Sequence, residues 1–197
     1  MPDLVRYLTH PQAHVDPARA VPSWGLSALG HARVAALIDR GWLRGTTLVV
    51  SSAETKAIET AVPIAKALNV RCEVCVAMHE NDRSATGFLP PGEFEGVADL
   101  FFANPDASIR GWETARAAQA RIVRQADAVL DRAEAGDVLI VGHGAVGTLL
   151  MCHYAGLAIS RAHDQPAGGG HYFALRRSSR EIVHRWRPME AAAAGGV

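Results

Sequence analysis

The chain has 197 residues, 49% of them hydrophobic, and its 20 basic and 20 acidic side chains give a formal net charge of zero. This length and composition predict one domain over residues 1–190, followed by a disordered tail over residues 191–197. Balanced charge argues against nucleic acid or an anionic membrane surface as a partner. No apolar run is as long as a signal sequence or a membrane span, so we expect a cytoplasmic protein with no membrane association.

The three cysteines are an odd number, which argues against a disulfide framework. Cys72 and Cys75 lie in an expected strand, whose alternation places their thiols on opposite faces of a sheet. No second Cys or His pair follows at a spacing typical of metal sites. We therefore expect no metal ion and no cofactor.

Strands alternate with helices along the chain. Apolar runs predict strands over residues 4–7, 46–51, 70–78, 138–141, 172–175 and 182–186. Helical periodicity and capping residues predict helices over residues 27–40, 54–68, 93–102 and 112–135, and a further helix from about residue 145. This alternation predicts an α/β fold with a mainly parallel sheet and helices on both of its faces.

The run Asp137-Val-Leu-Ile-Val-Gly-His143-Gly144 is the most informative stretch of the sequence. A short apolar strand ends at Gly142, and His143 follows at its carboxyl end, where open α/β sheets bind their ligands. Backbone N–H groups at the start of the next helix, among small residues, favour an anion. The structural alternative is a tight turn with a hydrogen-bonded histidine.

Three expected strand ends meet at one edge of the sheet, and they carry Arg6-Tyr7, Ser51-Ser52 and Gly142-His143. Arg6 offers a planar donor pair, Lys56 lies one turn into the following helix, and His143 can donate from its ring. Together they predict a pocket for an oxyanion. Taken separately, each has an ordinary role: Arg6 in a surface ion pair, Lys56 on a solvated helix face and His143 in a turn.

Four ordered motifs resemble those of the histidine phosphatase superfamily, which includes the cofactor-dependent phosphoglycerate mutases. Leu4-Val5-Arg6 is similar to the family's opening strand, which normally continues as Arg-His-Gly. Residues 25–30 resemble its Leu-Thr/Ser-x-x-Gly helix start, and residues 51–61 resemble its Ser-Ser-x-x-x-Arg-Ala-x-x-Thr-Ala segment. Val141-Gly-His143-Gly looks like the family's second-histidine segment, and Glu80 lies where the family often carries its acid. The resemblance implies a three-layer sandwich like that of phosphoglycerate mutase.

In that family the first histidine becomes phosphohistidine, two arginines and the second histidine hold the phosphoryl oxygens, and an acid protonates the leaving group. The resemblance implies phosphate binding by Arg6, Lys56, His143 and Gly144, and catalytic roles for His143 and Glu80. On this alignment Tyr7 replaces the nucleophile and Lys56 replaces the second arginine. A phenol with a pKa near ~10 is protonated at neutral pH, so the ordinary mechanism cannot run through Tyr7.

Three hypotheses follow for a protein whose partner is a small phosphorylated molecule. In the first, His10, which Pro11 biases toward an extended backbone, is a displaced nucleophile. In the second, the protein is a catalytically silent binding protein for phosphate or another anion. In the third, His143 or Glu80 activates water against a substrate held by Arg6 and Lys56. The sequence indicates neither the substrate nor the oligomeric state.

Two loops are expected beside the pocket. Over residues 80–88 we expect a lid, in which Arg83 holds a substrate carboxylate or second phosphate and Phe88 excludes water. The alternative there is a solvated loop with Asp82 paired to Arg83. Residues 164–170 form either a second rim loop, whose glycines allow a close approach, or a plain turn before a strand.

Overall fold

A six-stranded sheet forms the centre of the computed structural model, which describes residues 3–191. Its strands lie in the order β3-β2-β4-β1-β5-β6. The first four run parallel to one another, β5 pairs antiparallel with β1, and β6 pairs antiparallel with β5. The strands are β1 (Leu4–Thr9), β2 (Thr46–Ser52), β3 (Arg71–Cys75), β4 (Asp137–Gly142), β5 (His171–Arg176) and β6 (Ile182–Pro188). The prediction of an α/β fold with a mainly parallel sheet is confirmed.

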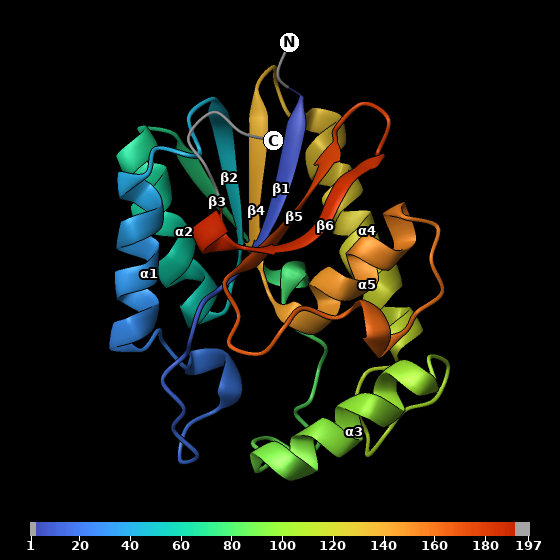
Figure 1. Cartoon of the computed structure of the whole chain (residues 1–197). Coiled ribbons are helices and arrows are strands. Elements are labelled where there is room, and N and C mark those ends of the chain that lie inside the picture. The colour runs from blue at the N-terminus through green and yellow to red at the C-terminus, as the bar shows by residue number, and fades with distance from the viewer. Residues whose placement is uncertain (1–2, 192–197) are drawn as a thin grey trace.

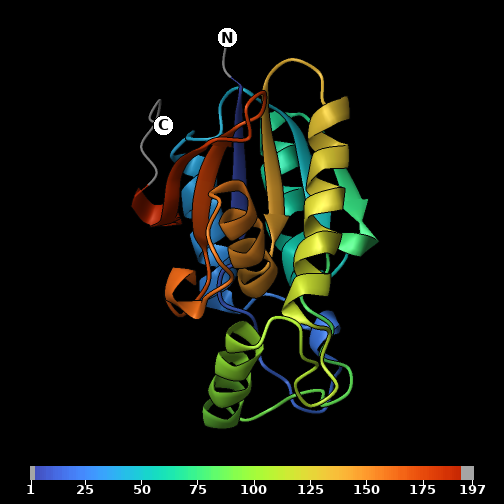
Figure 2. The ribbon, with the colours of Figure 1, turned by 90° about the vertical axis from the view of Figure 1, so that its right-hand side faces the viewer.

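Helices cover both faces of this sheet (Figure 1). On one face lie α1 (Ala28–Asp39) and α2 (Thr55–Leu68), and on the other lie α4 (Ala115–Arg132) and α5 (Gly144–Tyr154). The remaining helix, α3 (Pro91–Ala103), lies beyond the carboxyl ends of the parallel strands in both views (Figures 1 and 2). No helix within residues 3–191 is long and apolar enough to cross a membrane.

The sequence explains where these helices begin and how they pack. The Ser27 side chain accepts a hydrogen bond from the Gly30 N–H at the start of α1, and Thr114 caps α4 in the same way through the Ala117 N–H. Alternating apolar side chains of the strands form two buried clusters, one on each face of the sheet. Cys75 packs against one cluster and Cys72 against the other, as strand alternation predicts.

The first strand is longer than the sequence suggested. β1 continues two residues beyond Tyr7 to Thr9, because its pairing with β4 extends to Thr9 opposite Gly142. The residue that follows the strand end is therefore His10. At the other end of the chain, Ala191 closes a short 3-10 turn, and the rest of the predicted disordered tail lies outside the described residues.

Candidate active site

The carboxyl ends of β1, β2 and β4 bring His10, Ser52 and His143 together. The His10 backbone is held on both sides: its N–H donates to Gly142 O (3.0 Å), and its carbonyl accepts from Gly170 N (3.0 Å). A Cβ on Gly169, whose φ is +62°, would lie 2.3 Å from His10 O, so only glycine permits this approach. Hydrogen bonds of its main chain thus fix the position of His10.

Within residues 3–191, one nitrogen of the His10 ring has no hydrogen-bond partner. Its Nδ1 lies 2.8 Å from Pro11 O, and because a carbonyl only accepts, the Nδ1 proton must be the donor. In the neutral ring, Nε2 then carries a lone pair. Burial, with a smaller contribution from the Lys56 charge, lowers the pKa of His10 to about 4, so the ring is neutral at neutral pH.

His143 has no exposed surface, and its ring centroid lies 5.2 Å from that of His10. Its Nε2 lies 2.8 Å from Ser52 Oγ. Ser52 Oγ also accepts the Glu54 N–H and can either donate its proton to Nε2 or accept one from it. When Ser52 donates, the proton of the neutral ring lies on Nδ1, a buried atom that has no hydrogen-bond partner within residues 3–191. In that state Nδ1 is a donor available to a ligand.

Glu54 connects several parts of the site. Its carboxylate accepts from Lys56 Nζ and, at 2.9 Å, from the Glu80 N–H, and it lies 3.5 Å from His143 Nε2. Burial alone would raise the pKa of Glu54, but His143 and Lys56 lower it to about 2. Lys56 Nζ also donates to Val21 O at 3.1 Å, which leaves one of its three protons for a ligand.

The Glu80 carboxyl group lies at the N-terminus of α5. Its Oε1 accepts from the N–H groups of Asn81 and Val146, both at 3.0 Å, and its Oε2 accepts a longer bond of 3.2 Å from Ala145. Burial nevertheless raises the pKa of Glu80. A carboxyl group of raised pKa is suited to donate a proton.

Arg121 of α4 holds the segment that carries Glu80. Its guanidinium donates to the carbonyl oxygens of Ala77 (2.8 Å), His79 (2.9 Å) and Glu80 (3.2 Å). Glu113 pairs with the same guanidinium at 2.7 Å. The position of the acid therefore depends on a side chain forty-one residues away in the sequence, as the separation of the two bonded residues shows.

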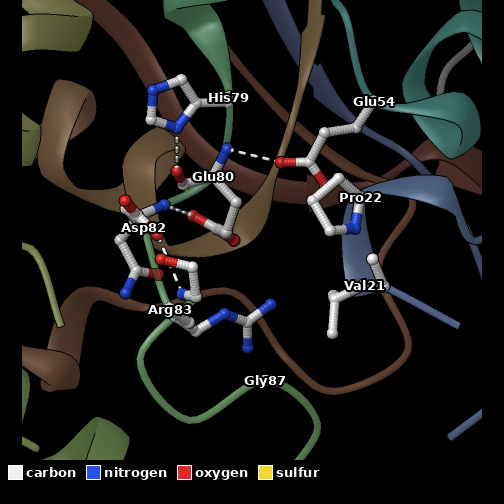
Figure 3. A pocket seen from close by; sticks show the side chains of 11 residues that line it. Val21, Pro22, Glu54, His79, Glu80, Asp82, Arg83 and Gly87 are labelled. Carbon is white, nitrogen blue, oxygen red and sulfur yellow. Dashed lines mark hydrogen bonds between the residues drawn. The ribbon is translucent and has the colours of Figure 1, made fainter. Parts of the chain in front are cut away.

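Two cavities meet at this site. The main cavity, of about 600 Å³, is lined by His10, Glu80 and Gly144, with aromatic side chains on the α3 side. The side cavity, of about 430 Å³, is lined by Glu54 and Glu80 among others. Arg83 and Asn81 line both cavities, and Figure 3 shows the Arg83 guanidinium reaching into the side cavity.

Arg83 carries a charge without an ionic partner. Its guanidinium lies over the rings of Phe94 (5.0 Å) and Trp112 (5.7 Å), and within residues 3–191 it makes no hydrogen bond or ion pair. In the same part of the chain, the buried Nδ2 atom of the neighbouring Asn81 has no hydrogen-bond partner. The ion pair between Asp82 and Arg83, which was the alternative to a lid, is therefore not formed.

Two predicted site residues lie elsewhere. Arg6 pairs with Asp137 at 2.7 Å, at the amino end of β4, and stacks on Trp42 at 5.2 Å. It stands four strand positions before His10, about 13 Å away at ~3.3 Å per residue, so its predicted role in phosphate binding is wrong. Phe88 packs 5.8 Å from Trp24 and lines a neighbouring cavity with Arg83 and Phe94, outside the main cavity.

Tyr7 does not occupy the nucleophile position. Its ring is buried against Phe173 and Trp186, and its hydroxyl accepts from the His143 N–H (3.0 Å) and donates to His143 O (3.1 Å). Burial raises the pKa of this phenol further above its usual value. Tyr7 therefore holds the main chain of His143 from behind the site, and His10 occupies the position facing the cavity.

The family model of the histidine phosphatase superfamily (branch 1) matches residues 12–185. The chain belongs to the histidine phosphatase superfamily. This confirms the resemblance seen in the sequence. The match begins two residues after His10, so the placement of that histidine comes from the strand register.

Solved structures share this fold at low sequence identity. Mycobacterial glucosyl-3-phosphoglycerate phosphatase matches with a TM-score of 0.75 and 18% identity, over 98% of this chain and 99% of that one. A mutant phosphoserine phosphatase from Entamoeba histolytica, in complex with phosphoserine, matches with a TM-score of 0.77 and 11% identity, over 95% and 98%. No curated protein sequence matches the chain significantly. These similarities establish the fold.

Proposed function

We propose that this member of the superfamily hydrolyses the phosphomonoester of a small molecule, with His10 as the nucleophile. The observation that carries the proposal is the neutral His10 ring, whose Nε2 is left free by the Nδ1 bond to Pro11, beside the unpartnered Nδ1 of His143. Glu80, whose carboxyl group has a raised pKa, lines the same cavity as His10. His10 and Glu80 thus line one cavity, and His143 lies next to His10, with 5.2 Å between the ring centroids.

The reaction takes two balanced steps. First, His10 Nε2 forms a bond to phosphorus while the bond to the leaving-group oxygen breaks, and that oxygen takes the proton of Glu80. In the second step the Glu80 carboxylate accepts a proton from water, whose oxygen attacks phosphorus as the bond to Nε2 breaks. Inorganic phosphate leaves, and His10 and Glu80 return to their initial protonation states.

Donors from three elements would hold the phosphoryl oxygens. They are His143 Nδ1, the remaining proton of Lys56 and the Gly144 N–H, which has no partner within the helix because it stands in the first turn of α5. Arg83 supplies a further positive charge at the rim of the main cavity. Its free guanidinium suits a second acidic group of the substrate or the phosphoryl group itself.

Proteins of the same fold support a small phosphorylated substrate. The mycobacterial relative is named for glucosyl-3-phosphoglycerate, and the Entamoeba histolytica enzyme has been solved with phosphoserine and with 3-phosphoglyceric acid. A cavity of about 600 Å³ is in the range of sites that enclose small ligands.

A catalytically silent phosphate-binding protein is the second candidate. The observation that favours it is the ion pair between Lys56 and Glu54, both buried, which neutralises the lysine charge nearest to His10 and His143. Such a site would hold an oxyanion while stabilising the transition state of phosphoryl transfer less well.

Phosphate release from p-nitrophenyl phosphate and a set of alkyl phosphomonoesters separates the two candidates. The wild-type protein should turn over at least one ester, and His10→Ala should abolish turnover while its affinity for inorganic phosphate changes little. His14→Ala, at an exposed histidine, is the control and should behave as wild type. Stoichiometric phosphate binding without any turnover would favour the silent protein, and unchanged turnover in His10→Ala would favour direct attack by water.

A further inference from the structure

The loop before β5 carries Gln165, whose side-chain amide lies beside the proposed phosphoryl site. We propose that Gln165, oriented by Thr9, donates a hydrogen bond from Nε2 to a phosphoryl oxygen at the N-terminus of α5. The inference rests on the proposed function, since it names a further residue that binds the group transferred to His10. Neither Gln165 nor Thr9 is charged, so this hydrogen bond would orient the phosphoryl group without adding charge to the site.

The hydroxyl of Thr9 fixes which way the Gln165 amide faces. Thr9 Oγ1 accepts from the His171 N–H at 3.0 Å, so its own proton is available to a second partner. The nearest acceptor is Gln165 Oε1, at 2.7 Å, while His171 O is farther away at 3.2 Å. The amide oxygen therefore faces Thr9, and the NH₂ group faces the opposite way.

That NH₂ group lies against the start of α5. A Cβ placed on Gly144 would be 2.6 Å from Gln165 Nε2, so the two residues are in direct contact. Gly144 follows His143 and lines the main cavity together with Gln165 and His10. Within residues 3–191 the Nε2 atom has no hydrogen-bond partner. Its two protons are thus free beside the Gly144 N–H, which is expected to face the anion.

The main chain of Gln165 is tied to the same helix. Its N–H donates to Asp164 Oδ1 at 2.8 Å, and the same oxygen accepts from Thr148 Oγ1 of α5 at 2.7 Å. The amide is therefore held from β1 through Thr9 and from α5 through Asp164. A donor fixed at both ends loses little conformational freedom when it binds.

Calorimetric titration with inorganic phosphate tests the inference. Gln165→Leu should weaken phosphate binding by about 10-fold to 100-fold, as expected for the loss of a hydrogen bond to a charged group. Gln165→Glu keeps an oxygen for Thr9 but replaces the NH₂ group with an anionic oxygen, so it should weaken binding further. Gln125→Leu, at a half-buried glutamine on α4, is the matched control and should bind as wild type.

Variants of Thr9 test the orienting role. Thr9→Val should weaken phosphate binding and raise KM with a smaller effect on kcat, whereas Thr9→Ser, which keeps the hydroxyl, should restore both. Wild-type affinity in both Gln165 variants would overturn the inference, as would a wild-type protein that binds no phosphate. Turnover is measured separately, so phosphate binding that depends on Gln165 in a protein without turnover would refute only the proposed hydrolysis.

Discussion

Burial shifts the pKa values of His10 and Glu80 in opposite directions, and both shifts favour the neutral form. An imidazole loses its charge by losing a proton, so burial lowers its pKa to about 4, whereas a carboxyl group loses its charge by gaining one. Between the two pKa values the site holds an unprotonated nucleophile and a protonated acid. This is the combination that attack on a phosphomonoester requires.

If Glu80 protonates the leaving group, the loss of kcat/KM on its substitution depends on the leaving group of the ester. Glu80→Gln should lower kcat/KM by about 10²-fold to 10⁴-fold for an alkyl phosphate, whose alkoxide must be protonated as it leaves. The loss should be under about 10-fold for p-nitrophenyl phosphate, because nitrophenolate leaves without a proton. Wild-type kcat/KM for the alkyl ester should fall as pH rises through the raised pKa of Glu80.

Steady-state kinetics with both esters measure this difference. The control is Glu134→Gln, at an exposed glutamate outside both cavities. Equal losses on the two esters would mean that Glu80 binds the phosphoryl group or maintains the structure and does not act as the acid.

Single residues of this site were only partly predictable from the sequence. His143 and Glu80 could be found because each follows a recognisable element or motif. Glu54 and Gln165 were missed, because their partners Glu80 and Thr9 lie 26 and 156 residues away and no local pattern connects them. Because Arg6-Tyr7 resembles the start of the family's Arg-His-Gly motif, the sequence leaves His10 as a displaced nucleophile in one of three hypotheses.

The position of His10 depends on the length of one strand. Apolar residues alone placed the end of β1 at Tyr7, whereas pairing with β4 carries the strand to Thr9. Strand register is set by long-range contacts and turn geometry, so a local sequence pattern leaves an error of a few residues at strand ends. The order and type of the α-helices and β-strands, which follow from periodicity, were predicted correctly, although Val76–Met78, predicted as the end of a strand, form a short 3-10 helix.

The ion pair of Arg6 at one end of β1 therefore stabilises the fold, whereas the other end carries the site. Substitution of Arg6 tests this difference. Arg6→Ala should lower the free energy of unfolding by about 3–5 kcal/mol, because it leaves the buried Asp137 carboxylate without its partner. Affinity for inorganic phosphate should stay within about 2-fold of wild type. Urea unfolding and calorimetry measure the two quantities, and Arg6→Lys, which keeps the charge, should unfold at an intermediate urea concentration.

A folded Arg6→Ala protein that has lost phosphate binding would place Arg6 in the site after all. It would also contradict the register between β1 and β4.

Across the whole molecule, the site makes stability depend on pH. Burial lowers the pKa values of both His10 and His143 below the usual 6.5, so the unfolded chain takes up these protons at a higher pH than the folded protein does. The stabilisation from His10 is complete above pH 6.5 and is lost as pH falls toward 4, and that from His143 is likewise lost as pH falls below 6.5. Glu54, with a folded pKa of about 2 against 4.5, adds a further loss between these values.

Replacing one of these titrating histidines should reduce the pH dependence of the free energy of unfolding. Between pH 6.5 and 4, the free energy of unfolding of His10→Gln should fall less steeply than that of wild type, by up to ~1.4 kcal/mol per pH unit. Urea denaturation at several pH values measures the slope. His153→Gln, at an exposed histidine, should keep the wild-type slope, and an unchanged slope in His10→Gln would mean that His10 is protonated equally in both states.

Direct detection of phosphohistidine tests the central claim most directly. Wild-type protein mixed rapidly with a ³²P-labelled phosphomonoester and quenched in alkali should carry an acid-labile label on the peptide that contains His10. The same peptide from His10→Ala should carry none. Turnover of the ester without any labelled protein, or with the label on a residue other than His10, would contradict the account.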